Sequence, residues 1–206
     1  MHQYEDSSTR FFATYEEDVD AATATVPGGV ITGRGLAYWR EAPVQLKWES
    51  LGTRAAFLAW AARSSPEPAV YSIELPAQDR GLDPGGELTF RLAQAEASGQ
   101  PVDLTVELTD ESGRTARRPL SHVAVLLPPV VSRFLKPPAG SGAPRSEVVF
   151  QDFAFRLSDL VASSPGFDPR RLRCIAFVFD RTESGSVVLD DLGWRRGLPP
   201  PEASSR

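Results

Sequence analysis

The stretch LRCIAFVFDRTESGSVVLDDLGW (172–194) decides the fold class of this 206-residue chain. Its first half alternates in polarity, so that Ile175, Phe177 and Phe179 share one face of an extended strand. A polar segment, TESG, follows as a turn, and SVVLDDLGW then reads as a further strand. The stretch therefore predicts two short β-strands separated by a turn.

The same two-residue period recurs along the chain, in YSIELP, ELTFRLAQ, DLTVELTD and FAFRL. After DLTVELTD, the segment ESGR is a turn and TARRPL is the returning strand of a hairpin. Fainter strands are expected at VITG, LAYW, VQLKW and AFLAWAA. About ten short strands with Pro/Gly turns predict an all-β sandwich or barrel. The positions expected to face the core are Tyr71, Ile73, Leu75, Leu88, Phe90, Leu92, Leu104, Val106, Leu108, Phe153, Phe155 and Leu157.

Two short helical turns are expected between the strands. The first covers SDLVASS, where the Ser158 hydroxyl can cap the helix. The second is at DPRRL, where Asp168 precedes Pro169 at a first-turn position.

Composition excludes several classes of function. The formal net charge of −5 argues against nucleic-acid binding, which needs basic patches that neutralise phosphates. No segment has the length of a membrane-spanning helix, and HQYEDSST after Met1 is too polar for a signal peptide. The lone Cys174 excludes an internal disulfide and a cysteine zinc cage. These features leave the cellular compartment open.

Catalytic motifs are absent from the sequence. It lacks GxSxG, HExxH, GxGxxG and the phosphate-binding loop. The two histidines are His2, near the terminus, and His122, which follows Ser121. A Ser-His pair adjacent in sequence is not a catalytic pair in space. The sequence therefore predicts a protein that is not an enzyme.

Two adjacent carboxylates interrupt the last strand, at Asp190 and Asp191. Neighbouring residues lie on opposite faces of a regular strand, so one acid turns toward the packed side and needs a cation or hydrogen-bond donors. Acids also follow aromatic residues near the N-terminus, in YEDSS (4–8) and YEEDVD (15–20). If the first and last strands are neighbours, these acids meet. Calcium, which takes six to eight oxygen ligands, suits such a cluster, whereas solvated acids are the alternative.

Aromatic residues provide candidate sugar-binding positions. Trp39 and Trp48 flank REAPVQLK, and Tyr38 lies beside the first. A flat aromatic ring can stack on the apolar face of a sugar. Trp60, inside AFLAWAA, is expected in the core, and Trp194 is expected to be partly buried.

The segments YEED, FQDFAFRLSDLV and LRCIAFVFDRTESGSVVLDDLGW resemble the galactose-binding-like β-sandwich used by many carbohydrate-binding modules. More narrowly, the chain resembles the C-terminal sandwich domain of some large bacterial α/β-hydrolase-type proteins. The resemblance implies a jelly-roll sandwich with a structural calcium ion. The implied ligands are Glu16 with Asp18, and Asp190 or Asp191, with Glu5 and Asp6 competing for the first pair.

The resemblance covers about Tyr15 to Trp194, and the Pro/Gly-rich composition of KPPAGSGAPR and GLPPPEASSR completes the predicted domain layout. Residues 1–14 form a leader or first strand, 15–196 the sandwich with a flexible loop at 136–145, and 197–206 a Pro-rich tail or linker. The resulting hypothesis is a non-catalytic accessory module that binds a glycan or targets a hydrolase to its substrate. The alternative is a structural domain that packs on a catalytic domain and binds no soluble ligand. An enzyme built in the sandwich is a third hypothesis, and an extracellular location would follow only if the chain belongs to an exported hydrolase.

Overall fold

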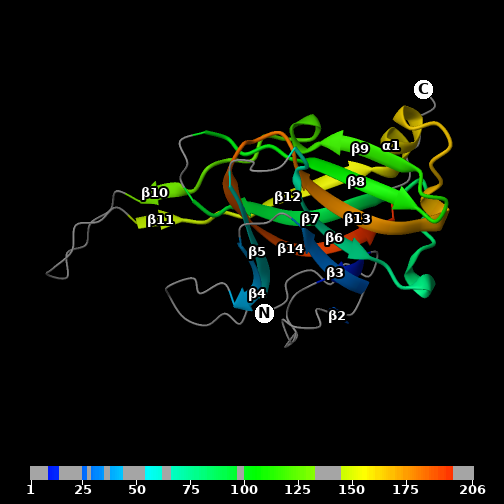
Figure 1. Cartoon of the computed structure of the whole chain (residues 1–206), viewed down its shortest axis with the longest axis horizontal. Helices are drawn as coiled ribbons and strands as arrows, with labels where there is room; N and C mark the ends of the chain where they lie inside the picture. The colour runs from blue at the N-terminus through cyan, green and yellow to red at the C-terminus, as the bar shows by residue number, and fades with distance from the viewer. Residues whose placement is uncertain are drawn as a thin grey trace, which may run out of the picture.

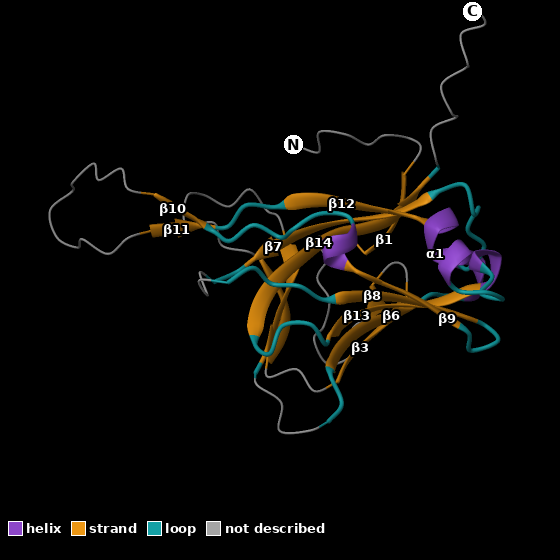
Figure 2. Ribbon diagram, turned by 90° about the horizontal axis from the view of Figure 1, so that it is seen from above, coloured by secondary structure: helices purple, strands orange, loops and turns teal. Residues whose placement is uncertain are grey.

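The protein is a two-layered β-sandwich, as the alternating pattern predicts (Figure 2). The computed structural model describes residues 9–13, 25–26, 29–34, 38–43, 54–61, 66–96, 100–132 and 145–196. All strand pairs within these ranges are antiparallel. No helix in the described ranges has both the length and the hydrophobicity needed to cross a membrane.

Each layer is a six-stranded sheet. Sheet A runs in the order β12 (Gln151–Arg156), β7 (Glu87–Gln94), β14 (Gly185–Arg195), β5 (Arg54–Trp60) and β4 (Tyr38–Pro43), and β1 (Thr9–Ala13) also pairs with β14. Sheet B runs in the order β2 (Thr25–Val26), β3 (Gly29–Arg34), β6 (Ala69–Glu74), β13 (Leu172–Phe179), β8 (Thr105–Asp110) and β9 (Thr115–Pro119). The strands β10 (Val130–Ser132) and β11 (Arg145–Glu147) form a separate ribbon that projects from the sandwich (Figure 1).

The last strand, β14, is central to sheet A. One side of β14 pairs with β7 along most of its length. The other side pairs with β5 as far as Leu189 and with β1 from Leu192 onward. Asp190 and Asp191 therefore lie at the junction where one neighbouring strand ends and the other begins.

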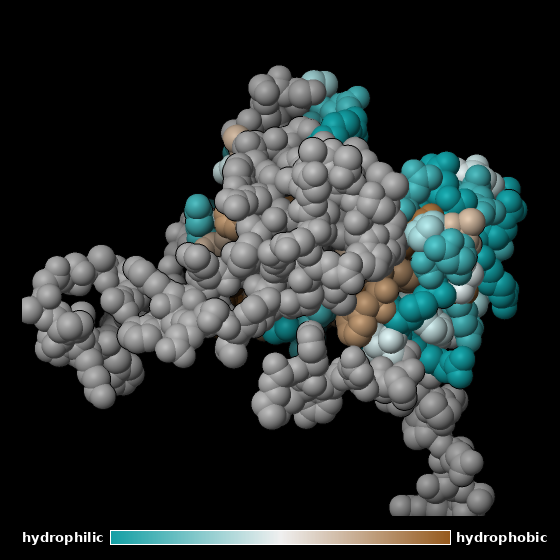
Figure 3. All heavy atoms as spheres, turned by 90° about the horizontal axis from the view of Figure 1, so that it is seen from below, coloured by the Kyte–Doolittle hydropathy of each residue, from teal (hydrophilic) through white to brown (hydrophobic). Residues whose placement is uncertain are grey.

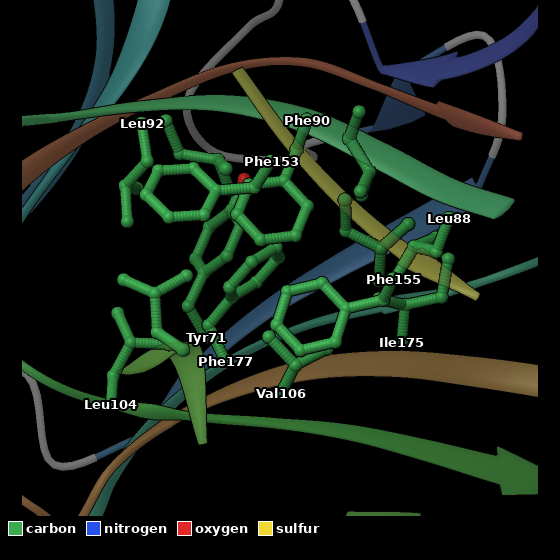
Figure 4. Packing of buried hydrophobic residues seen from close by; sticks show 14 of the residues in the cluster. Tyr71, Leu88, Phe90, Leu92, Leu104, Val106, Phe153, Phe155, Ile175 and Phe177 are labelled. Atoms are coloured by element: carbon green, nitrogen blue, oxygen red, sulfur yellow. The ribbon is translucent and has the colours of Figure 1, made fainter. Parts of the chain in front are cut away.

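The core between the sheets is rich in phenylalanine, as the alternation predicts (Figure 4). The ring of Phe90 lies 5.5 Å from that of Phe153 and 5.8 Å from that of Phe155, and meets Phe177 edge-on at 5.1 Å. Burying one such side chain contributes about 1.5–3 kcal/mol. All the positions expected to face the core are buried, including Ile175 and Phe179.

The burial of Trp60 and Trp194 is as predicted from the sequence. Trp60 is buried, stacks on Phe179 at 4.2 Å, and donates a hydrogen bond from Nε1 to the Thr182 carbonyl. Trp194 is half-buried and packs against the core. Its indole lies directly over Gly86, where any larger residue would collide with the ring.

The helical turns are only partly as predicted. Helix α1 spans Leu157–Ser163, but Arg156 occupies the N-cap position and no side chain caps the helix. The prediction that Ser158 caps this helix is wrong, because the helix begins two residues earlier than such a cap requires, directly at the end of β12. The turn η3 (Pro169–Arg171) confirms the second prediction, since the Asp168 side chain accepts from Arg170 N. Two further turns are η1 (Ala77–Asp79) and η2 (Leu120–His122).

Two sequence predictions on strands have distinct outcomes. The hairpin predicted over DLTVELTDESGRTARRPL is confirmed by the register of β8 with β9. The strand predicted at VQLKW lies outside the described residues.

Candidate functional site

Of the aspartate doublet of β14, Asp190 is surrounded by protein groups, whereas the side chain of Asp191 is 34% exposed. Asp190 is 1% exposed, and its Oδ1 accepts a hydrogen bond of 2.9 Å from the backbone N of Asp191. Its Oδ2 lies 3.8 Å from Nη1 of Arg91, the residue directly opposite on β7. A buried carboxylate requires such donors and a nearby cation.

A β-bulge places both carboxylates beside the same guanidinium. Between Asp190 and Gly193, β14 contains one residue more than the facing part of β7. Asp191 takes a left-handed conformation there, with φ of 49°, which aspartate tolerates better than most residues. Its Oδ2 lies 3.2 Å from Arg91 Nη1. The two acids, which would point to opposite faces of a regular strand, thus both meet Arg91.

Arg91 is also held by two further groups. Its Nε lies 3.9 Å from Oδ1 of Asp152, whose side chain is 93% exposed on β12. The guanidinium carbon lies 4.8 Å from the ring centroid of Phe150, within the range of a cation–π contact. Three carboxylates surround one guanidinium, so the cluster carries a formal charge of −2.

These groups form rows on the outer face of sheet A, the face turned away from sheet B. The register aligns Asp152, Arg91 and Asp190 across β12, β7 and β14. The adjacent row contains Ala93, Val188 and Phe57. We name the outer surface formed by the first row, with Asp191 and Phe150, the Arg91 cluster. It combines fixed hydrogen-bonding groups with an aromatic ring.

The aromatic candidates of the sequence lie toward the other edge of sheet A. The backbone of β4 places Tyr38 opposite Ala59 and Trp39 opposite Leu58. Trp48 lies outside the described residues. The role of these three residues stays a prediction.

Only some of the candidate calcium ligands lie within the described residues. Asp190 and Asp191 are described, whereas Glu16, Asp18, Glu5 and Asp6 lie outside the described residues. Within the described ranges, no three His, Cys, Asp or Glu side chains gather closely enough to hold a metal ion. The doublet supplies carboxylate oxygens of the kind calcium prefers, but Arg91 competes for the same oxygens. Calcium binding at the doublet therefore stays a prediction, and the described residues offer only Asp190 and Asp191 of the candidate ligands.

Nucleophilic side chains are not arranged for catalysis at the positions singled out by sequence. The Ser121 hydroxyl donates to Asp103 Oδ2 at 2.9 Å, and the neighbouring His122 is exposed. Burial raises the pKa of the Cys174 thiol to about 11, so this half-buried residue stays protonated at neutral pH.

Arg91 and Phe150 are site residues that the sequence did not reveal. In ELTFRLAQ, Arg91 is simply a polar residue at an outward position of an alternating strand. Its importance depends on the register with β14, which sequence periodicity does not determine. The signal available in the sequence is the acid doublet itself, because two adjacent carboxylates in a strand indicate that a cation such as arginine lies on a neighbouring strand.

Comparisons with solved structures identify the architecture. A family 30 carbohydrate-binding module superposes with a TM-score of 0.55 at 15% identity, covering 84% of this chain and 83% of that chain. The family 11 module of the cellulosomal cellulase Lic26A-Cel5E of Clostridium thermocellum also gives 0.55, at 7% identity, covering 94% and 98%. The chain has the β-sandwich fold of carbohydrate-binding modules.

The comparison with an exo-β-agarase shows the same fold in another setting. The TM-score is 0.54 at 13% identity, and the match covers 95% of this chain but 25% of the agarase chain. No protein-family model and no curated protein matches the sequence. The predicted jelly-roll, galactose-binding-like fold class is confirmed, and at these identities the likeness concerns the fold alone.

Proposed function

We propose that this chain is a non-catalytic module that binds a glycan at the Arg91 cluster, on the β12 side of the outer face of sheet A. The carrying observation is the Arg91 cluster, in which Asp152 and the Arg91 guanidinium lie beside the Phe150 ring. Carboxylates accept hydrogen bonds from sugar hydroxyls, guanidinium groups donate to them, and aromatic rings stack on pyranose faces. The fold shared with carbohydrate-binding modules supports the same role.

Aromatic residues of β4 are separate candidates for sugar contact, because Ala93 and Val188, on the outer face between them and the Arg91 cluster, are buried. Directly opposed residues of an antiparallel pair share a face of the sheet. The backbone register puts Tyr38 in the row of Ala59, and Trp39 in the row of the core residue Leu58. The register therefore favours Tyr38 over Trp39 as the residue that contacts a sugar.

Affinity electrophoresis in gels containing mixed-linkage β-glucan, xyloglucan or agarose tests this proposal. We expect one polysaccharide to retard the protein, and Asp152→Ala to weaken the retardation about tenfold in apparent Kd. Asp152 is a sharp probe because its side chain is 93% exposed, so the fold does not depend on its burial. The matched control is Arg117→Ala, which changes a charged residue on sheet B.

Substitutions in β4 discriminate between the aromatic candidates. Tyr38→Ala should reduce retardation more than Trp39→Ala, and Trp48→Ala tests the remaining candidate. Unchanged migration of the parent protein in every gel would refute the proposed glycan-binding function. If Asp152→Ala and all three aromatic substitutions leave the retardation unchanged, the glycan binds at a different surface of the protein.

A calcium ion at the doublet is a second part of the proposal. When bound, calcium would supply a multivalent positive charge that joins the doublet to acids of the N-terminal segment. Asp190 and Asp191 are the ligands that this part of the chain offers. Their side chains already lie on one side of β14 because of the bulge, which supports shared binding.

The alternative function, a domain that packs on a catalytic partner, is favoured by a specific observation. Exposed aliphatic side chains follow one another along the segment from η2 to β10, at Val123, Val125, Leu127 and Val130, and Val149 is exposed just before β12. Gln151 fixes this segment by bonding Leu127 N and the Val125 carbonyl. Contiguous exposed apolar side chains mark interaction surfaces.

This alternative concerns attachment to a hydrolase. The sandwich of the exo-β-agarase is part of a much longer chain, which supports a partner of that kind. Triple replacement of Val123, Val125 and Leu127 by Thr should leave glycan retention unchanged but abolish binding to a separately produced catalytic domain. In the view of Figure 3, the described part of the surface is hydrophilic toward one end, with hydrophobic patches beside it.

A further inference from the structure

A small hollow lies between the edge strands of the two sheets, away from the Arg91 cluster. It is bounded by β12 of sheet A, by β9 and η2 of sheet B, and by α1, which contacts both strands. Its volume is about 150 Å³. Sites for whole small molecules usually have volumes of about 300–1,000 Å³, so this hollow suits a single functional group of a ligand.

Positive charge predominates in the lining. Arg118 and Arg156 supply two guanidinium groups, and Asp159 supplies one carboxylate. Arg118 Nη2 donates to the backbone carbonyl of Asp159 at 3.0 Å, which fixes the guanidinium without neutralising it. Arg156 Nε lies 3.7 Å from Glu87, but Glu87 is held more closely by Arg195 at 2.8 Å. The arginine charges at the hollow are therefore only partly compensated.

One donor atom of Arg118 lacks an acceptor. The Nε of Arg118 is buried and has no hydrogen-bond partner among the described residues. An unsatisfied buried donor on a charged group is costly, so such atoms in native structures call for an explanation. Because Nε has almost no accessible surface, the donors that Arg118 can present to a ligand are the N–H groups of its Nη atoms. Guanidinium N–H groups make charge-assisted hydrogen bonds to the oxygens of a carboxylate or a sulfate.

We propose that this hollow binds the oxyanion group, carboxylate or sulfate, of an acidic ligand. Arg118 donates to the anion from a fixed position, and Arg156 provides a second, exposed positive charge at the rim. His122, also in the lining, adds an imidazole donor. Phe155 and Leu160 form an apolar wall that limits access of water to the charged pair. The site does not depend on glycan binding at sheet A.

Titration followed by ¹H–¹⁵N NMR tests the site on the full chain. The probes are sodium glucuronate and sodium sulfate, compared with sodium chloride at equal ionic strength and with neutral glucose. We expect saturable shifts of the Arg118 Nε–Hε signal and of the Asp159 and Leu160 amides with at least one oxyanion. Saturation by glucuronate alone identifies an acidic sugar, and saturation by both probes identifies a general oxyanion site.

Matched variants make the result decisive. Arg118→Gln should weaken binding about tenfold or more, because it removes a charge-assisted hydrogen bond to the anion. Arg117→Gln is the control, because Arg117 is the adjacent residue but pairs with Glu107 and Asp180 instead of lining the hollow. Arg156→Gln, at a side chain 73% exposed, provides a second test if Arg118→Gln fails to fold. Linear shifts equal to those in chloride, equal saturation by glucose, or unchanged affinity in both lining variants would overturn the proposal.

Discussion

Arg91 and Asp190 stand directly opposite each other on β7 and β14, with 3.8 Å between Nη1 of the arginine and Oδ2 of the aspartate. The aspartate is almost fully buried, whereas the arginine side chain is 39% exposed. The pair is thus asymmetric. If the aspartate is removed, solvent can hydrate the remaining arginine, but if the arginine is removed, solvent cannot readily hydrate the buried aspartate.

Arg91→Met should therefore destabilise the fold by about 1–3 kcal/mol, because Asp190 stays buried with less compensation. The exposure of Arg91 keeps the loss below that of a fully buried pair. Urea unfolding measures the change. Adding Asp190→Asn to Arg91→Met should recover part of the lost stability, since it removes the buried charge. Strict additivity of the two single substitutions would show that the pair is not coupled.

Gly86→Ala should destabilise the protein by about 1–3 kcal/mol, the usual cost of overpacking. A Cβ atom at Gly86 would overlap the Trp194 indole, which packs against the core. Gly85→Ala is the matched control, because its nearest atom outside the adjacent residues would be Asp83 Oδ1 at an ordinary 3.5 Å. Urea unfolding of both variants checks this, and equal stability of the two would mean that the indole moves freely.

The stability of the fold should fall in acid partly through Asp110. Burial alone would raise the pKa of this carboxyl, but hydrogen bonds from the Ser112 hydroxyl and from backbone N–H groups of Arg114, Asp168 and Ser112 hold the pKa below its ordinary value. These bonds measure 2.6, 3.0, 3.2 and 2.8 Å respectively. A folded pKa below the unfolded one stabilises the protein above the unfolded value, about 3.9, and the gain is lost as pH falls through the folded pKa.

Asp110→Asn should consequently cost about 1–3 kcal/mol at pH 7, and the difference from the parent should shrink below pH 4. Urea unfolding between pH 7 and pH 3 measures both quantities. Asp152→Asn, at an exposed side chain, is the control and should follow the parent at every pH. A constant difference across the range would show that Asp110 does not carry this pH dependence.

Thermal melting in chelator and in added calcium tests the proposed metal. If calcium binds, Tm should rise as the free calcium concentration exceeds the Kd. The free energy of unfolding increases by about 2.7 kcal/mol when the free calcium concentration is 100 times the Kd. The rise should disappear in Asp190→Ala and in Asp191→Ala, and comparison of Glu16→Ala with Glu5→Ala identifies the N-terminal partner. An identical Tm in both buffers would leave Arg91 as the principal counter-charge of the doublet.

Much of the sandwich could be predicted because alternation directly reports which residues are buried. The inward positions around Ile73, Phe90 and Phe177 are all buried, although Ala93, Ala176 and Val178, at outward positions of β7 and β13, are buried as well. Helix capping was less predictable: Leu157 begins α1 while its N–H donates to the Gly86 carbonyl at 3.0 Å, a contact between distant segments that displaces Ser158 from the cap position.

The Arg91 cluster illustrates what periodicity cannot determine. Two adjacent acids suggested that one of them needs compensation, and this requirement is met in the structure. The means of compensation, however, is a bulge at Asp191 together with an arginine on a strand about a hundred residues earlier. Neither the inserted residue nor the cross-strand register has a local sequence signature.

The position of β14 also governs the order in which the protein can assemble. In chain order it is the last strand, and it joins residues as distant as Thr9 and Arg195. During synthesis, sheet B can pair β13 with β6 and β8 before β14 exists. At that stage, the described part of sheet A consists only of the pairs β12–β7 and β4–β5. Strand β1 cannot yet pair, because its partner is β14. Such late, long-range closure slows folding and leaves apolar strand faces open to solvent until the last strand is inserted.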